Sequence, residues 1–295
     1  MMESSANLIN SKELIIILGP TGVGKTDYSI ELAKKLQSPI INCDSRQIFK
    51  ELKIGTAAPS VEQLEQVKHY FIYSNSVSEY YTAGRYEIEA LDLLNQLFIK
   101  HDKLVMVGGS GLYIDALCNG LDDFPEADQD LRAQLSLKCQ NEGLESLSKE
   151  LQLRDIDSYN SIELSNKQRV IRALEVTIQT GKKFSEWKSA TKKSRPFKIT
   201  KIGLNRDREI LYNRINKRVD NMIEDGLVAE VASLQEYRYM PALNTVGYKE
   251  LFAYLDGDSS LENAVELIKR NSRRYAKRQI TYWGRDADIK WLELS

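Results

Sequence analysis

With 295 residues, 42 % of them hydrophobic and 28 % charged, the chain can form one large or two modest domains, and its composition excludes a disordered protein. Its formal net charge of −1 neither indicates nor excludes a nucleic-acid partner, so only the distribution of charge is informative. No apolar run approaches membrane-spanning length, and residues 1–13 lack the features of a signal peptide, so we expect a soluble cytoplasmic protein. The three widely spaced cysteines fit neither a disulfide framework nor a zinc site.

The first element is a short buried strand, predicted by the apolar run Leu14–Leu18. It leads directly into GPTGVGKT, which matches the phosphate-loop pattern G-x-x-x-x-G-K-[S/T] at every fixed position. Backbone amides of such a loop, and the positive end of the helix expected over Asp27–Leu36, bind phosphate oxygens. An ordinary glycine turn would match this pattern by chance in roughly one chain in a hundred. We therefore predict a diphosphate or polyphosphate site formed by Gly19, Pro20, Thr21, Gly22, Val23, Gly24, Lys25 and Thr26, with the Thr26 hydroxyl as a ligand for Mg²⁺.

A second strand is expected over Ser38–Asp44, with a carboxylate at its carboxyl end. In parallel α/β sheets, ligands bind outside this end of the strands. A polar cluster follows there, formed by Asp44, Ser45, Arg46 and Gln47.

The chain is less regular over residues 54–81, and a helix is then predicted over Ala83–Lys100, with Ile88, Leu91, Leu94 and Phe98 on its apolar face. A third strand, Lys103–Val107, runs into the sequence GGSGLY. Its glycines suggest a second place where backbone closely approaches a ligand.

Helical patterns alone occupy residues 121–195. The clearest covers Asn166–Thr180, with Gly181 as its expected C-cap. Strand signals resume at Lys198–Leu204. We therefore predict an α/β fold, with a parallel-sheet core of the P-loop type formed by residues 1–120 and 196–295 and an inserted all-helical domain over residues 121–195.

Two amphipathic helices are expected in the C-terminal part, over Asp207–Gly226 and after the capping box at Ser259–Glu262. The last helix carries basic residues at helical spacing, namely Arg270, Arg273, Arg274, Lys277 and Arg278. Most charge runs are solvated helix faces, but those usually mix signs, and like charges at this spacing are destabilising. With aromatic residues nearby, the stripe favours nucleic-acid binding.

Asp44 can be read as a metal ligand, a general base or a helix cap. A P-loop nucleotidase usually has a second aspartate after a later strand, as a partner of magnesium. Here the third strand ends in glycines, which leaves Asp44 available for proton transfer. His69 and His101 are isolated in the sequence, and we interpret both as structural.

Ten segments in order are GPTGVGKT, DSRQIF, IGTAAPS, TAGRYEIEA, VGGSGLY, QRVIRALEV, TGKKFS, RINKRVDNMIEDGL, TVGYKEL and RRYAKRQITYW. Together they resemble the bacterial tRNA dimethylallyltransferases (tRNA isopentenyltransferases) over essentially the whole chain. The resemblance implies transfer of a dimethylallyl group from dimethylallyl diphosphate to N6 of the adenosine 3′-adjacent to the anticodon, with Mg²⁺ as cofactor and the anticodon stem-loop of tRNA as partner. The zinc finger of eukaryotic members is absent, and we expect a monomer.

The resemblance also implies roles for particular residues. Thr21–Thr26 would hold the diphosphate, Arg218 would face it, and Asp44 would be the general base, with Thr21 and Arg218 assisting catalysis. Residues that would contact tRNA are Asp44, Ser45, Arg46, Gln47, Ser110, Arg132, Gln168, Arg169, Val170, Ile171, Arg172, Asn244, Thr245, Val246, Gly247, Tyr248 and Lys249, to which the basic stripe adds Arg273, Arg274, Lys277 and Arg278. The family often has paired histidines where this chain has Lys68-His69-Tyr70, so no role is carried over there.

Three alternatives remain open. An adenylate isopentenyltransferase would share the phosphate loop and the base but has less need of the helical insertion and the basic stripe. A small-molecule P-loop kinase is disfavoured by the missing acid at the end of the third strand. A non-catalytic, nucleotide-switched RNA-binding protein would transfer no prenyl group.

Overall fold

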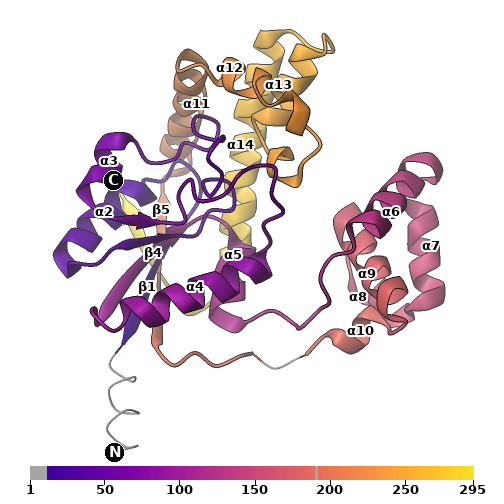
Figure 1. Ribbon diagram of the computed structural model, residues 1–295. Helices are drawn as coiled ribbons and strands as arrows, with labels where there is room; N and C mark the ends of the chain where they lie inside the picture. The colour runs from indigo at the N-terminus through magenta and orange to yellow at the C-terminus, as the bar shows by residue number, and fades with distance from the viewer. Residues whose placement is uncertain (1–11, 190–191) are drawn as a thin grey trace, which may run out of the picture. The chain divides into compact units, whose positions relative to one another are not determined.

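The computed structural model describes residues 12–189 and 192–295 (Figure 1). These residues fall into two compact units: the chain up to Asn119 together with Ser194–Ser295, and Gly120–Lys193. The stretch 1–11, which carries most of the segment judged to lack a signal peptide, lies outside the described residues. Within the described part, no helix is long and apolar enough to cross a membrane.

A parallel sheet forms the centre of the larger unit, which confirms the predicted α/β class (Figure 1). Among the described residues it has six strands in the order β3-β2-β4-β1-β5-β6. Their bounds are β1 Glu13–Leu18, β2 Ile40–Asn42, β3 His69–Tyr70, β4 Lys103–Gly108, β5 Lys198–Arg206 and β6 Ile289–Leu294. Ile15 and Ile17 of β1 share a core cluster with Ile30, while Leu14 and Ile16 on the other face are equally buried. Both faces are therefore covered, which explains why the central strands are continuous apolar runs.

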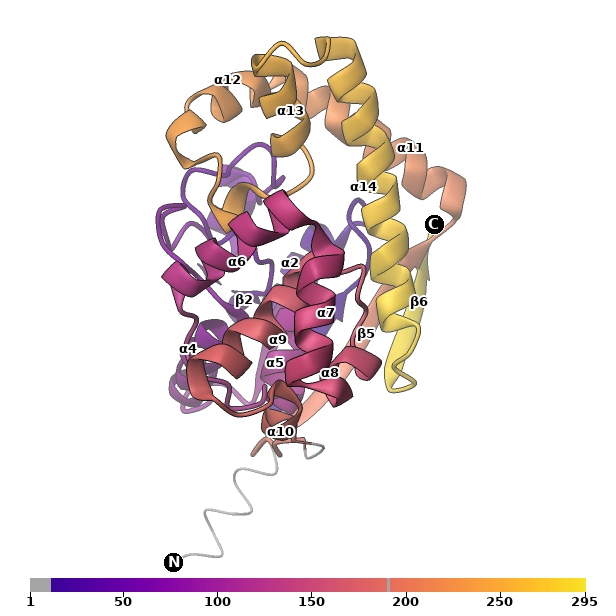
Figure 2. The ribbon, with the colours of Figure 1, turned by 90° about the vertical axis from the view of Figure 1, so that its right-hand side faces the viewer.

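The helices of this unit are α2 Lys25–Leu36, α3 Val61–Gln66, α4 Ala83–Leu97, α5 Gly111–Asn119, α11 Arg208–Glu224, α12 Leu227–Ala232, α13 Tyr248–Leu255 and α14 Leu261–Trp283, with short 3-10 helices at Gln235–Tyr237 and Pro241–Leu243. The side chain of Asp207 caps α11, and that of Ser260 caps α14. Helices α11 to α14 lie together at one end of this unit (Figure 2). They share a second hydrophobic core that includes Tyr248. Its inner wall is the segment after β2, through Ile48 and Leu52.

The buried face of α4 includes Leu94 and Phe98, as predicted, but differs from the prediction in the first half of the helix. Ile88 is 66 % exposed, whereas Tyr86 and the carboxylate of Glu87 are buried. Glu87 pairs with Arg195 at 2.7 Å, and Arg195 also donates to the carbonyl of Leu117 at 2.6 Å. Because a charged residue with a distant partner occupies the inner face there, apolar spacing alone assigned Ile88 wrongly to that face.

The smaller unit is all helical, with α6 Gln129–Glu142, α7 Leu144–Arg154, α8 Ile156–Ser161, α9 Lys167–Thr180 and α10 Phe184–Trp187. Helix α9 is its core element, capped by Asn166 and ended by Gly181 at φ 70°, as the sequence predicts. Glu175 on α9 is completely buried and accepts from Arg132 at 2.6 Å and from Arg172 at 2.9 Å.

Candidate active site

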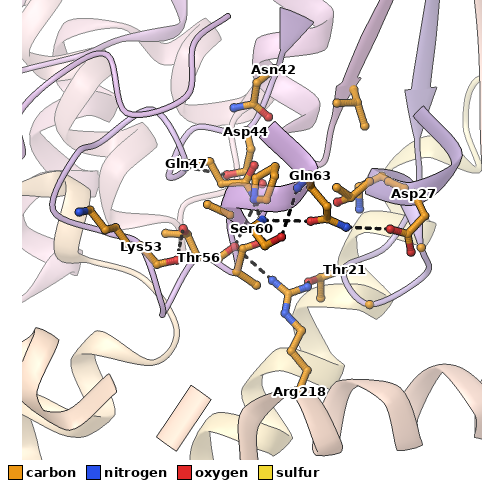
Figure 3. Close-up of a pocket in the computed structure, with 18 of the residues that line it drawn as sticks. Thr21, Asp27, Asn42, Asp44, Gln47, Lys53, Thr56, Ser60, Gln63 and Arg218 are labelled. Carbon is orange, nitrogen blue, oxygen red and sulfur yellow. Dashed lines mark hydrogen bonds between the residues drawn. The ribbon is translucent and has the colours of Figure 1, made fainter. Parts of the chain in front are cut away.

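Two adjoining cavities lie in the larger unit, at the edge of the sheet where β1, β2 and β4 end. The larger cavity has a volume of about 700 Å³. It is lined by the glycine loop, which is the GPTGVGKT segment of residues 19–26, and by the end of β2, residues 53–63, α11 and α14. The smaller has a volume of about 310 Å³ and reaches residues 244–249. Both are lined by Thr21, Asp44 and Arg218 (Figure 3). The three residues predicted to act in catalysis therefore meet where the cavities join.

The glycine loop has the backbone that its sequence predicts. Gly22 and Gly24 have φ values of 81° and 111°, in the left-handed region that glycine adopts at little cost. Helix α2 begins at Lys25, so the loop amides and the positive end of the helix lie at the same edge of the cavity. The side chain of Val23 is buried in the sheet core, so Val23 can contribute only its backbone.

Lys25 is held inside this loop. Its Nζ donates to the carbonyl oxygens of Gly19 at 2.8 Å and of Pro20 at 2.9 Å. Burial lowers the pKa of Lys25 to about 8, and the nearby carboxylate of Asp44 opposes that shift. Lys25 is thus a cation kept in a poorly hydrated place, where an anionic ligand would be strongly favoured.

Asp44 follows directly on β2 and uses one carboxylate oxygen to hold its own loop. Oδ1 accepts the backbone N–H groups of Arg46 at 2.9 Å and of Gln47 at 3.4 Å. Among the described residues, Oδ2 has no hydrogen-bond partner, and Asp44 lines both cavities. One oxygen therefore fixes the side chain while the other is available to a reacting group.

Two arginines of α11 also contact the glycine loop. Arg218 donates to Thr21 Oγ1 at 3.2 Å and to the carbonyl of Thr56 at 3.1 Å, as the dashed lines in Figure 3 indicate. Arg214 donates to the carbonyl of Gly22 at 2.8 Å. Burial lowers the pKa of Arg218 to about 10, again opposed by Asp44. At neutral pH both Lys25 and Arg218 are cationic and adjoin the same carboxylate.

The loop 53–57 is held by Glu230 of α12, which sequence reasoning missed. The Glu230 carboxylate accepts three successive backbone amides, those of Lys53, Ile54 and Gly55, at 2.8–3.0 Å. It also accepts the Tyr248 hydroxyl at 2.7 Å. These bonds hold the loop in which the Thr56 carbonyl accepts a hydrogen bond from Arg218.

The glycines at the end of β4 and after it are required by close packing, and Gly108 also lines the larger cavity. A Cβ on Gly108 would lie 2.1 Å from the Cys43 carbonyl oxygen, and one on Gly111 would lie 2.3 Å from the Tyr282 ring. A Cβ on Gly109 would lie 2.6 Å from Nε2 of Gln279. These glycines make room for the end of β2 and for helix α14, a packing reason that the sequence did not predict.

Several residues predicted to contact tRNA line the cavities: Asp44, Ser45, Arg46, Gln47, Asn244, Thr245, Val246, Gly247, Lys249 and Arg278. Others do not reach them. The side chain of Tyr248 is fully buried on Glu230. Ser110 is also buried, where its Oγ accepts the Ser45 amide at 2.9 Å, so it supports the loop after β2.

In the helical unit, the side chains of Val170 and Ile171 are buried in the core, so only the backbone of these two residues is left for a contact with RNA. Arg132 and Arg172 are engaged with the buried carboxylate of Glu175. Gln168 and Arg169 are exposed, so they keep side-chain atoms at the surface.

The basic stripe on α14 is narrower than predicted. Arg270, Arg274, Lys277 and Arg278 are exposed. Arg273 is half-buried and donates to Asn216 Oδ1 of α11 at 2.5 Å. Arg273 therefore joins two helices, and the exposed stripe consists of the other four residues.

The cavity has few candidates for holding a metal. No group of three or more His, Cys, Asp or Glu side chains within the described residues could bind a metal ion. Thr26 lines the larger cavity, beside the start of α2. Mg²⁺ in phosphate sites takes few protein ligands and completes its shell with substrate oxygens and water. A single hydroxyl next to an anion-binding loop fits a Mg²⁺ ion that arrives with a diphosphate.

His69, interpreted from the sequence as structural, lines the larger cavity as well. Its Nδ1 lies 2.7 Å from the carbonyl oxygen of Val67, and burial lowers its pKa. A neutral ring tied to its own loop is consistent with a supporting role for this side chain.

Fold and cavity together define the class: a parallel α/β protein with a glycine loop, a strand-end carboxylate and buried cations at the carboxyl edge of its sheet. The family model described as IPP transferase matches residues 47–286. The chain belongs to this family.

Curated relatives and solved structures agree with that assignment. The chain is 51 % identical over 279 residues to "tRNA dimethylallyltransferase 1" of Bacteroides thetaiotaomicron, covering 95 % of this chain and 91 % of the relative. Its fold is similar to the tRNA isopentenylpyrophosphate transferase of Bacillus halodurans, with a TM-score of 0.70, 36 % identity and coverage of 96 % and 90 %. It is also similar to a eukaryotic dimethylallyltransferase solved acting on tRNA, with a TM-score of 0.77, 28 % identity and coverage of 96 % and 74 %.

Proposed function

We propose that this protein transfers the dimethylallyl group of dimethylallyl diphosphate to N6 of the adenosine 3′-adjacent to the anticodon in tRNA and releases diphosphate. The names of the similar proteins support the reaction. The observation that carries the mechanism is the meeting of Lys25, Arg218 and Asp44 around one cavity beside the glycine loop. A cationic, amide-rich cradle next to a free carboxylate oxygen suits the expulsion of an anion and the removal of a proton.

The glycine loop holds the leaving group. As the bond between the allylic carbon and oxygen breaks, negative charge grows on the diphosphate. Loop amides, Lys25 and Arg218 are positioned to stabilise that charge without reorganising, which is the most effective form of electrostatic catalysis. The Thr21 hydroxyl, held by Arg218, is within the same cradle. No phosphoryl group is transferred.

Asp44 acts as the general base. The lone pair of adenine N6 is delocalised into the ring, so the amine is a weak nucleophile. Removal of an N6 proton by Asp44 Oδ2 as the carbon–nitrogen bond forms contributes about 10²–10⁴-fold. Oδ1 stays on the amides of Arg46 and Gln47, which keeps the carboxylate oriented during the transfer.

Thr26 is the candidate protein ligand for Mg²⁺, with oxygens of the diphosphate as the other ligands. When bound, the ion supplies positive charge to the departing diphosphate. The rest of that charge comes from Lys25 and Arg218.

The exposed basic residues of α14 and the smaller cavity bind the RNA. Arg278 belongs to both the stripe and the wall of the smaller cavity. Phosphate contacts along the stripe would position the RNA, and the target base would leave its stack to reach Asp44, at the least cost in a single-stranded loop. The helical unit, residues 121–195 of the predicted insertion, would contact the anticodon stem through exposed residues such as Arg169.

One experiment separates this function from its rivals. The protein is incubated with Mg²⁺, labelled dimethylallyl diphosphate and an unmodified anticodon stem-loop, and in parallel with AMP in place of RNA. We expect label on the RNA and none on AMP. Label on AMP would indicate an adenylate isopentenyltransferase. No transfer, with nucleotide-dependent RNA affinity or with cleavage of a triphosphate, would indicate a switch protein or a kinase.

A further inference from the structure

We infer that Gln279 of α14 is a positioning residue for the glycine loop, and that it acts through Thr21. The inference rests on the proposed function, because it assigns the loop to diphosphate. Gln279 is far from this loop in the sequence, and it is not part of the phosphate-loop pattern.

Gln279 bridges two turns at the carboxyl edge of the sheet. Its Oε1 accepts the backbone N–H of Thr21 at 2.9 Å, and its Nε2 donates to the carbonyl of Gly109 at 2.9 Å. The residue is 6 % exposed. A flipped amide would set oxygen against oxygen and nitrogen against nitrogen, so the two contacts determine the orientation of the side chain.

The surroundings are shaped for this bridge. A Cβ on Gly109 would come within 2.6 Å of Gln279 Nε2, so only glycine leaves room for the amide. One turn earlier on α14, Tyr275 lines both cavities. One turn later, Tyr282 hydrogen-bonds Asp115 and packs on Gly111. Helix α14 thus packs on the turn after β4 through Gln279 and Tyr282, and Gln279 also contacts the glycine loop.

Thr21 is consequently held from two directions. Gln279 binds its amide, while Arg218 binds its hydroxyl at 3.2 Å. The oxygen and one N–H of the Gln279 amide are engaged by protein partners, so the side chain acts through the turns that it joins. Its effect is to fix the Thr21 peptide, which sets the direction of the following loop amides. Without it, the Thr21 N–H at the cavity wall loses its protein partner and the loop has more than one low-energy conformation.

The test compares Gln279→Met, which keeps the approximate shape but removes both hydrogen bonds, with wild type and with the control Thr281→Val on the same helix. The affinity for inorganic diphosphate with Mg²⁺ is measured by calorimetry, the affinity for an anticodon stem-loop by fluorescence, and thermal stability by scanning calorimetry. We expect diphosphate binding at least about tenfold weaker in Gln279→Met and a matching rise in KM for dimethylallyl diphosphate. RNA affinity and the Thr281→Val variant should be unchanged.

A second variant, Gly109→Ala, pushes the same amide from the other side and should weaken diphosphate binding in the same way. Wild-type diphosphate affinity in a folded Gln279→Met protein would overturn the inference. So would a parallel loss of stability, RNA binding and diphosphate binding, since that pattern marks a merely structural residue. If wild type itself binds no diphosphate, the proposed function fails and the inference fails with it.

Discussion

At the scale of single residues, the site depends on how two oxygens of one carboxylate are used. Asp44 Oδ1 accepts the amides of Arg46 and Gln47, which holds the side chain against the end of β2. Oδ2 is left for chemistry. A substitution that preserves the first oxygen but removes the charge can therefore separate the two uses.

Asp44→Asn should lower turnover by about 10²–10⁴-fold while leaving RNA affinity within a factor of about two, because an amide oxygen still accepts the loop amides but cannot take a proton. Diphosphate affinity should not fall, because the substitution removes a negative charge beside Lys25 and Arg218. Single-turnover transfer measures the chemical step, and direct titrations measure the two affinities. Asp44→Ala should lose turnover as well. An Asp44→Asn protein with near wild-type turnover would mean that another group is the base.

The lowered pKa of Lys25 predicts a pH dependence. The folded-state pKa is about 8, against an ordinary value of 10.5, so the ligand-free site loses its charge as the pH rises through about 8. Diphosphate affinity should fall over the same range. Ligand-free stability should rise between about pH 8 and 10.5, because the unfolded chain binds more protons there.

Calorimetric titration of the Mg²⁺–diphosphate complex across this range checks the first expectation. Lys25→Arg keeps its charge at every pH tested and provides the control for titration of the ligand itself. The same pH profile in Lys25→Arg would show that Lys25 is not the titrating group.

The chemistry of single residues was predictable where a local motif carries it. Thr21 and Lys25 lie in the loop and helix start that follow β1, Asp44 lies just after β2, and the carboxyl ends of parallel strands share one edge of the sheet. Gln279 and Glu230 were missed because their partners lie 258 and about 176 residues away in the chain. A glutamine in a basic helix carries no local sign of such a contact.

At the scale of elements, close packing requires glycine at the end of β4 and in the turn after it. Gly108→Ala should be destabilising by about 1–3 kcal/mol, because its Cβ would meet a backbone carbonyl that cannot rotate away, 2.1 Å from it. Gly84→Ala in the first turn of α4 is the matched control, since the nearest atom lies at 3.9 Å. It should be neutral or stabilising by about 0.5–1 kcal/mol.

Urea unfolding midpoints compare the two variants directly. Equal midpoints for Gly108→Ala and Gly84→Ala would contradict the close packing of β4 against the end of β2.

The exposed stripe of α14 predicts a salt effect. The double variant Arg274→Gln/Lys277→Gln should weaken RNA binding and reduce the slope of log K against log salt by about two, one for each RNA phosphate that the variant no longer neutralises. Arg273 is a poor probe, because its bond to Asn216 ties α14 to α11. Lys35→Gln/Lys100→Gln changes two exposed lysines away from both cavities and should leave the slope unaltered. An unchanged slope in the α14 variant would make this stripe an ordinary solvated helix face.

Elements with local signals were predicted well. Helix α9 has its caps at Asn166 and Gly181 because both act within a few residues of the helix end. The two-residue strand β3 was not predicted, since so short a run has no recognisable period and forms only by pairing with β2. On α4, Leu94 and Phe98 are buried as predicted, but Ile88 is not, because the Glu87–Arg195 pair that takes its place is a tertiary contact.

At the scale of the whole molecule, we propose different roles for the two units, catalysis for the larger unit and RNA binding for the helical unit. Every described residue that lines the two cavities belongs to the larger unit. The helical unit offers exposed polar side chains such as Gln168 and Arg169 on a core built around α9. We therefore expect substitutions at Arg169 to change RNA affinity and to leave diphosphate affinity unaltered.

The most direct measurement uses dimethylallyl diphosphate labelled with radioactive carbon in its alkyl group and radioactive phosphorus in its diphosphate, added with an anticodon stem-loop to wild type and to Asp44→Asn. We expect wild type to place carbon label on adenine N6 and to release an equal amount of phosphorus label as intact diphosphate, and Asp44→Asn to do neither at a comparable rate. Release of orthophosphate, or consumption of an added nucleoside triphosphate without carbon on the RNA, would contradict a glycine loop that holds a leaving group.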